Sequence, residues 1–182
     1  MEYKLSVGFN GNLELLEKMY ADKENKIGTL YTGGYLKEIT SGRYQHSKSE
    51  QELERIVEAV HNKNARLAVT LNSPCNVPPL SEKQWWKNVK NYLKHLETIG
   101  VDTAIIAHPF IMAIAKENTH LSVATSIICD VNTPRGALYY EDMGADVIVP
   151  SSSINYDLEQ LKQIKANLKK AKLALLVNEA CL

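Results

Sequence analysis

The polar residues nearest the end of the chain, Asn178, Glu179 and Cys181, are the first candidates for chemistry. They follow the apolar run Leu173-Ala-Leu-Leu-Val177 without a turn, and such a run predicts a buried parallel strand. In α/β proteins, ligands bind just past the carboxyl ends of parallel strands. A buried carboxylate there can transfer protons, so we expect Glu179 to be catalytic, with Asn178 facing the substrate beside it. A partnership between Glu179 and a buried basic residue fits the sequence equally well.

The three cysteines, Cys75, Cys129 and Cys181, all follow predicted strands. Thiolates bind zinc and iron–sulfur clusters, but the strong signals for such sites are closely paired cysteines, which this sequence lacks. An odd number of scattered cysteines also does not suggest a disulfide framework, and a reduced cytoplasmic setting is the simplest interpretation. We expect Cys75 and Cys129 to be small apolar fillers, and Cys181 to have a functional role.

His108 is the one histidine that directly follows a predicted strand on this face. An imidazole in that place can act as a general base or bind a substrate anion, so we include His108 among the catalytic candidates. The pair His108-Pro109 is also typical of a helix that opens there, because proline suits the first helical position.

Polar residues at other strand ends are candidates for substrate binding: Asn72, Ser126 and Ser151. Ser151 to Ser153 precede a helix and suit either a phosphate held by backbone amides or a helix cap. The long connection 33–48 carries Arg43, which we expect to reach the substrate if this segment covers the barrel mouth rather than forming a plain surface loop. No G-x-S-x-G turn or Ser-His-Asp order supports a nucleophilic serine.

The elements that must position these residues alternate along the chain. Apolar runs predict strands at Lys4–Phe9, Gly28–Thr32, Arg66–Leu71, Thr103–Ala107, Leu121–Thr125, Asp146–Val149 and Lys172–Val177. Helical spacing and caps predict helices near Leu13–Tyr20, Ser49–Asn62, Glu82–Ile99, Phe110–Glu117, Pro134–Met143 and Leu158–Leu168.

Local signals agree with these boundaries. Ser49 is followed by Glu52 in the pattern of a capping box, and Ser81 is expected to begin the next helix. Two junctions, at Gly100 and Gly144, are near copies in which glycine ends a helix and a strand starts soon afterwards. The copies indicate one architectural unit that is used repeatedly.

Alternating strands and helices predict an α/β fold around a parallel sheet. No G-x-G-x-x-G turn follows the first strand, which favours a (β/α) TIM-like barrel over an open, doubly wound, dinucleotide-binding sheet. A full barrel has eight strands and typically ~250 residues. We therefore expect residues 1–182 to form a single, incomplete barrel domain of about seven strands and six helices, closed by further chain or by an oligomeric partner.

The composition is that of a globular protein. The chain is 45% hydrophobic, and 21 basic residues balance 21 acidic residues, so no strong overall attraction to nucleic acid or anionic membranes is expected. The lysines after position 161 have the spacing of a solvated helix face more than of a basic binding patch. The amino terminus lacks the features of a secretion signal, and no apolar run approaches the ~18 residues needed to span a membrane.

Several stretches together make the chain resemble the collagenase-like peptidase family U32. These are Asn12-Leu-Glu-Leu-Leu, Leu30-Tyr-Thr-Gly-Gly34, the Gly-x-Asp strand starts, Pro150-Ser-Ser-Ser-Ile-Asn-Tyr-Asp and Leu175-Leu-Val-Asn-Glu-Ala-Cys-Leu182. The resemblance implies an N-terminal (β/α) barrel of a longer protein. It also implies that Cys181 matches the first of several family cysteines, which hold a [4Fe–4S] cluster in some branches.

Three functions follow from this resemblance as expectations. The first is a cluster-dependent enzyme that carries out oxygen-independent hydroxylation of RNA bases or quinone precursors, with Cys181 as a cluster ligand. The second is a metal-assisted, collagenase-like peptidase acting on peptides, although the sequence has no H-E-x-x-H motif. The third is a binding or assembly module, in which the partial barrel pairs with a second chain of its own or another kind.

Overall fold

The computed structural model describes residues 4–22, 24–39, 49–73 and 77–177. The strands are β1 (Leu5–Gly8), β2 (Ile27–Gly33), β3 (Arg66–Leu71), β4 (Thr103–Ile106), β5 (Ser122–Thr125), β6 (Val147–Ile148) and β7 (Lys172–Leu173). The α-helices are α1 (Leu13–Met19), α2 (Glu50–His61), α3 (Lys83–Thr98), α4 (Pro109–Asn118), α5 (Pro134–Asp142) and α6 (Leu158–Asn167). Two 3₁₀ helices, η1 (Ile127–Cys129) and η2 (Ser152–Ile154), follow β5 and β6 and were not predicted.

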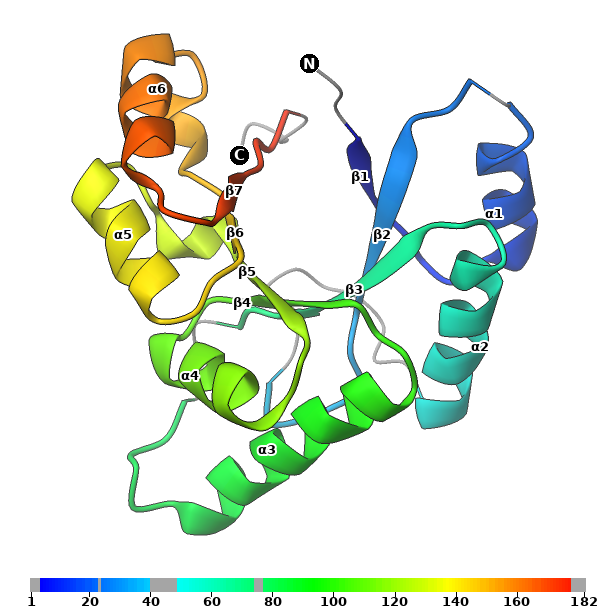
Figure 1. Ribbon diagram of the computed structural model, residues 1–182. Coiled ribbons are helices and arrows are strands. Elements are labelled where there is room, and N and C mark those ends of the chain that lie inside the picture. The colour runs from blue at the N-terminus through cyan, green and yellow to red at the C-terminus, as the bar shows by residue number, and fades with distance from the viewer. Residues whose placement is uncertain (1–3, 23, 40–48, 74–76, 178–182) are drawn as a thin grey trace.

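The strands form one parallel sheet in the simple order β1-β2-β3-β4-β5-β6-β7. A doubly wound sheet reverses its strand order at a switch point, so this order excludes the open-sheet alternative. In Figure 1 the sheet curls with the helices on its outer side, and β1 and β7 stand on the two sides of an open gap. The prediction of an incomplete (β/α) barrel is confirmed.

The two faces of the curled sheet have different compositions. Side chains alternate between faces along a strand. The outward set, including Leu30, Leu67 and Ile106, is fully buried in one core with the apolar faces of α2, α3 and α4. The register places the inward set in rows, one of which is made by Tyr31, Ala68, Thr103 and Ser122. The inner wall is therefore made largely of small and hydroxyl side chains.

Helix caps explain most of the element boundaries. Ser49 accepts a hydrogen bond from the amide of Glu52, as predicted, and Asp157 caps α6 through the amide of Gln160. The expectation for Ser81 is wrong: Glu82 is the residue before α3, and it makes no side-chain cap. The backbone carbonyl of Ser81 instead accepts from the amide of Lys83, so the helix is entered through a backbone turn.

The last strand also differs from the prediction. β7 ends at Leu173, and two of the following residues that were expected to be buried are exposed, Leu175 at 43% and Val177 at 83%. The reason is that β7 pairs with β6 on one side and, within the described residues, with no strand on the other. An apolar run at the edge of an open sheet lacks the second neighbour that would bury it.

The two near-copy junctions fold in the same way. Gly100 and Gly144 have φ values of +90° and +102°, a left-handed conformation that glycine adopts without strain and that ends the preceding helix. Two residues later, Asp102 accepts the amide of Leu67 at 2.8 Å, and Asp146 accepts the amide of Val123 at 2.8 Å. Each aspartate thus lies just before one strand and binds the preceding strand of the sheet, β3 for Asp102 and β5 for Asp146.

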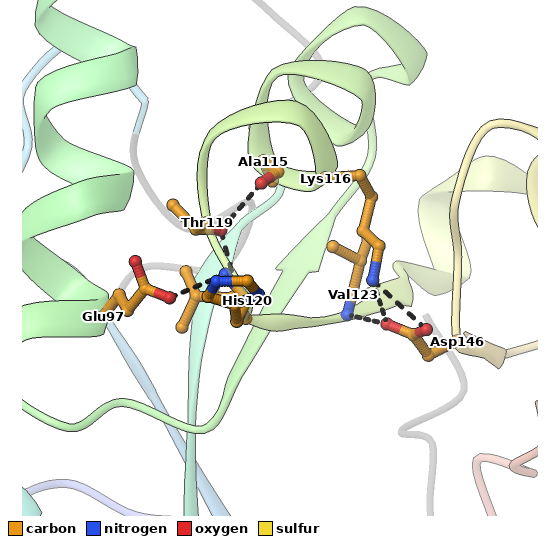
Figure 2. A network of polar contacts seen from close by, with 8 residues as sticks. Glu97, Ala115, Lys116, Thr119, His120, Val123 and Asp146 are labelled. Carbon is orange, nitrogen blue, oxygen red and sulfur yellow. Dashed lines mark hydrogen bonds and ion pairs between the residues drawn. The ribbon is translucent and has the colours of Figure 1, made fainter.

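A basic side chain and a second carboxylate complete each junction. His61 lies 3.0 Å from Asp102, and Lys116 lies 3.0 Å from Asp146. Figure 2 shows Asp146 accepting from both Lys116 and the backbone amide of Val123. It also shows the Glu97 carboxylate, which accepts from the backbone amide of His120 at 2.6 Å. Each junction therefore joins neighbouring segments through hydrogen bonds at the amino ends of the strands.

In the second junction, Glu141 takes the place that Glu97 has in the first. Its carboxylate accepts the amides of Lys169, Lys170 and Ala171 at 2.6–2.9 Å. Burial raises the pKa of Glu141, but these three amides and the charge of Lys169 outweigh it and hold the pKa below its usual 4.5. The resulting stabilisation is present above pH 4.5 and is lost as the pH falls through the lowered value.

We predict that Asp146→Ala lowers the free energy of unfolding by about 1–3 kcal/mol, because the amide of buried Val123 is left without an acceptor. Urea unfolding followed by circular dichroism measures this loss. Asp142→Ala is the matched control, since Asp142 pairs with Lys169 on the surface, where both side chains are more than 60% exposed. Equal losses in the two variants would contradict the assignment.

Candidate active face of the barrel

Two of the expected substrate-binding residues lie in contact at the carboxyl ends of β3 and β5. The Asn72 side-chain amide donates to the Ser126 hydroxyl at 3.0 Å, although 54 positions separate them in the sequence. Ser126 is only 2% exposed, and its hydroxyl also accepts from the amide of Ile128. The same hydroxyl therefore caps η1 and fixes the amide of Asn72.

Thr70, one step earlier on the inward face of β3, extends this polar surface. Thr70 is 5% exposed, and its hydroxyl donates to the carbonyl of Thr32 on β2 at 3.1 Å. Sequence reasoning did not single out Thr70, although its place two residues before Asn72 puts both side chains on one face of the strand. The inner wall thus offers neutral hydrogen-bonding groups in a row that leads to the strand ends.

His108 begins α4. Its Nδ1 accepts a hydrogen bond from the amide of Phe110 at 3.3 Å, and its ring stacks on that of Phe110 with centroids 5.7 Å apart. Partial burial lowers the pKa of His108. Because Nδ1 is an acceptor, the neutral ring carries its proton on Nε2. This geometry matches the role of His108 in opening α4. It leaves Nε2–H as a hydrogen-bond donor, whereas Nδ1 is already occupied as an acceptor and is not available as a general base.

Two aromatic rings, those of Trp86 and Phe110, lie close to His108. Trp86 lies 6.3 Å from His108 between ring centroids, and Trp85 packs edge-on against Trp86 at 4.8 Å. Phe110 is 52% exposed. The signal for this group was present in the sequence as Trp85-Trp86 at a helix start and Phe110 two residues after His108.

Ser151 lies at the carboxyl end of β6 and is 6% exposed. Its hydroxyl is 2.9 Å from that of Ser153 and accepts from the Ser153 amide, so it caps η2. The following α6 is capped by Asp157. The serine cluster therefore caps the short η2, which was not predicted, whereas Asp157 caps the predicted helix α6.

Cys129 is half-buried beside the end of β4. Its thiol donates to the carbonyls of Ile106 and Ala107 at 3.6 and 3.5 Å. Burial raises the pKa of Cys129 to about 11, and a hydrogen bond with Tyr140 lowers it only in part. A thiol held protonated in this way is a poor nucleophile and a poor metal ligand, which agrees with the filler role.

Five predicted residues lie outside the described residues: Arg43, Cys75, Asn178, Glu179 and Cys181. Their roles stay predictions. Within the described part of the chain, Cys129 is the one cysteine, so that part does not by itself contain the thiolate set of an iron–sulfur cluster.

Comparison with known proteins identifies the family. The model of peptidase family U32 matches residues 13–181, almost the whole chain. The chain belongs to peptidase family U32. The U32 resemblance read from the sequence is thereby confirmed.

One curated relative is the uncharacterized protease MJ1657 of Methanocaldococcus jannaschii, which is 30% identical over 132 residues. The match covers 72% of this chain but 39% of that protein, so the chain spans about two fifths of the relative's length. The solved U32 peptidase Mk0906 superposes with a TM-score of 0.80 at 16% identity, over 96% of this chain and 68% of that one.

More distant barrels share the fold alone. A 3-hexulose-6-phosphate synthase from Salmonella typhimurium superposes with a TM-score of 0.60 at 12% identity, over 96% of this chain and 78% of that one. A GH113 β-1,4-mannanase superposes with a TM-score of 0.56 at 14% identity, over 96% and 71%. In the described residues of the U32 chain, no helix is long and apolar enough to cross a membrane.

We predict that His108→Ala lowers the free energy of unfolding by about 0.5–2 kcal/mol, because the N-cap acceptor of α4 is lost, whereas His108→Asn keeps an acceptor and most of the stability. Burial lowers the pKa of His108, so its contribution is present above the ordinary value of 6.5 and is lost as the pH falls through the lowered value. Urea unfolding at several pH values tests both statements. A cap contribution that grew on acidification would contradict them.

We predict that Cys129 reacts slowly with iodoacetamide in the folded protein. A pKa of about 11 instead of 9.0 corresponds to a roughly 100-fold smaller thiolate fraction at pH 8, since each pKa unit is a factor of ten. The Cys75→Ser/Cys181→Ser variant isolates this thiol, and mass spectrometry gives its alkylation rate with and without urea. Equal rates in the two conditions would contradict the buried, protonated thiol.

Proposed function

We propose that this U32 chain is the barrel portion of an enzyme that binds its substrate over the carboxyl ends of β3 to β6. The observation that carries the proposal is the Asn72–Ser126 pair, a half-buried amide fixed by a buried hydroxyl across the carboxyl ends of β3 and β5, which flank β4 in the parallel barrel. Buried polar groups cost free energy unless they are paired, and barrels gather their functional groups at this end.

The chemistry of this surface suits a neutral, polar substrate group. Thr70 offers a hydroxyl group and Asn72 offers an amide group. Both groups are uncharged. Amide and hydroxyl groups can bind the edge of a nucleobase, a quinone oxygen or a peptide bond. The aromatic group around His108 adds a flat apolar surface at the neighbouring strand end.

For the reaction, we favour cluster-dependent hydroxylation of an RNA base or a quinone precursor by the complete protein. Cys181 would be one thiolate ligand of a [4Fe–4S] cluster, and Asn178 and Glu179 would face the substrate beside it. The support is the family resemblance and the place of these residues in the sequence, a few positions after β7. Cys129 does not fit as a ligand, because its thiol is buried and protonated. The remaining ligands would be cysteines of the longer protein.

The alternative is a metal-assisted peptidase, which the names of the relatives favour. Among the described hydrogen bonds, neither Ser126 nor His108 has a carboxylate or imidazole partner of the kind that activates a nucleophile. Peptide cleavage that is lost on adding a chelator would support this alternative.

A non-catalytic assembly module is the third candidate. Its support is the open side of the barrel, where exposed Leu5 belongs to the edge strand β1 and exposed Leu175 and Val177 follow the edge strand β7. Light scattering of the 182-residue chain tests it, because a module that pairs through these edges is not monomeric.

We predict that the longer protein, purified and reconstituted without oxygen, binds iron in a Cys181-dependent manner. Cys181→Ala should lose most of the iron and the visible absorption, whereas Cys129→Ala, the matched control, should keep both. Iron binding that is unchanged in Cys181→Ala would exclude the cluster assignment.

The substrate surface has a separate test. RNA nucleosides and quinones from anaerobic cells that produce the longer protein are compared by mass spectrometry for products one oxygen atom heavier. Such a product should disappear with Cys181→Ala and fall strongly with Asn72→Leu, but not with the surface change Asn62→Leu. A product that is insensitive to Asn72→Leu would remove the Asn72–Ser126 pair from the substrate surface.

A further inference from the structure

A second group of ligand-type side chains lies away from the barrel mouth, between α2 and α3. Glu50 and Glu54 are four residues apart on α2, and His95 lies on α3. One ligand atom from each lies within 4.8 Å of the others. Residues at this helical spacing share one face of a helix, so α2 presents both carboxylates to the same side.

The imidazole of His95 is the unusual member of this group. Its Nε2 is shielded from solvent and makes no hydrogen bond with the described residues, although the Glu50 carboxylate oxygen is 3.1 Å away. The oxygen lies outside the direction of a ring N–H. By contrast, His61 Nε2 does hydrogen-bond to Asp102, at 3.0 Å. A nitrogen that closely approaches a carboxylate without donating to it has the arrangement of two ligands that share a cation.

The surroundings hold the imidazole in place. Tyr35 packs edge-on against His95 with centroids 6.1 Å apart, and edge-on against Tyr92 at 4.9 Å. The Tyr92 hydroxyl accepts the amide of Tyr35 at 3.2 Å. A Cβ on Gly34 would overlap this hydroxyl, so glycine is required for the close approach of the chain to α3.

The local charge favours a cation. Within the described residues, no lysine or arginine forms an ion pair with either Glu50 or Glu54. Burial, together with the charges of Glu50 and Glu54, raises the pKa of Tyr35 to about 12, so the ring lies in the field of the two carboxylates. An open hollow of about 510 Å³, lined by Ser49, Glu50, Gln51 and Glu54, gives solvent and ions access to the carboxylates.

We propose that Glu50, Glu54 and His95 bind a divalent zinc ion that joins α2 to α3. Two carboxylate oxygens and one imidazole nitrogen are a common zinc ligand set, and water would complete a tetrahedron. Ligand atoms at ~2.0–2.2 Å from zinc lie roughly 3–4 Å from one another. Both glutamates are exposed, so small rotations of their side chains bring the present separation into this range.

Zinc titration of the 182-residue chain tests the site. We expect isothermal titration calorimetry to show one Zn²⁺ per chain, and Co²⁺ to give the visible spectrum of a four- or five-coordinate site. His95→Gln and Glu54→Gln should each weaken Zn²⁺ binding by more than the ~10–100-fold that loss of an outer-shell partner costs. The matched controls His120→Gln and Glu58→Gln, which change exposed residues outside the group, should bind as the parent does.

Circular dichroism and thermal unfolding without metal establish that each variant is folded. Zinc should raise the unfolding temperature of the parent and of both controls, and leave that of His95→Gln and Glu54→Gln unchanged. Unchanged affinity in folded His95→Gln and Glu54→Gln would overturn the proposal, as would the absence of Zn²⁺ binding at millimolar concentration. Because the readout is binding, these outcomes are separate from those of the iron and product measurements.

Discussion

The parallel sheet depends on carboxylates that bind backbone amides of neighbouring segments at the amino ends of its strands. Each α-helix must return the chain to that end, and each return leaves amides without partners where the strand ladder begins. Asp102 and Asp146 accept such amides from the neighbouring strands, and Glu97 and Glu141 accept those that open the next segment. Because each aspartate follows a left-handed glycine by two positions and each glutamate precedes it by three, the helix end, the turn and the strand register are set together.

This arrangement separates stability from chemistry. The charged hydrogen bonds gather at the amino ends, whereas the carboxyl ends carry Asn72, Ser126, His108 and Ser151 in neutral hydrogen bonds. Most of these polar groups already serve as caps, so they are held in fixed orientations by the elements that they begin. A substrate group would therefore meet side chains whose positions are set by the fold rather than by the ligand.

The repeating elements could be predicted from the sequence because their signals are local. Helical spacing in α2 and α3, Pro134 at a first helical position, and Gly100 and Gly144 at helix ends all act within a few residues. The exposed course of the chain after Leu173 could not be predicted, because an apolar run has the same appearance whether or not a neighbouring strand covers it. The Asn72–Ser126 contact and the approach of His95 to Glu50 were likewise beyond sequence reasoning, since both join distant segments.

The two open edges of the sheet are not equivalent, and this limits how copies of the chain can associate. β1 and β7 differ in length, sequence and neighbours, so a contact between β1 and β7 joins two unlike surfaces. Pairing of β7 in one molecule with β1 in the next would be heterologous, and a heterologous contact closes only if its rotation completes a ring. Otherwise each addition leaves the same two edges free, and growth continues as a filament. Covering either edge is enough to stop that growth, because each added molecule needs one free β1 edge and one free β7 edge.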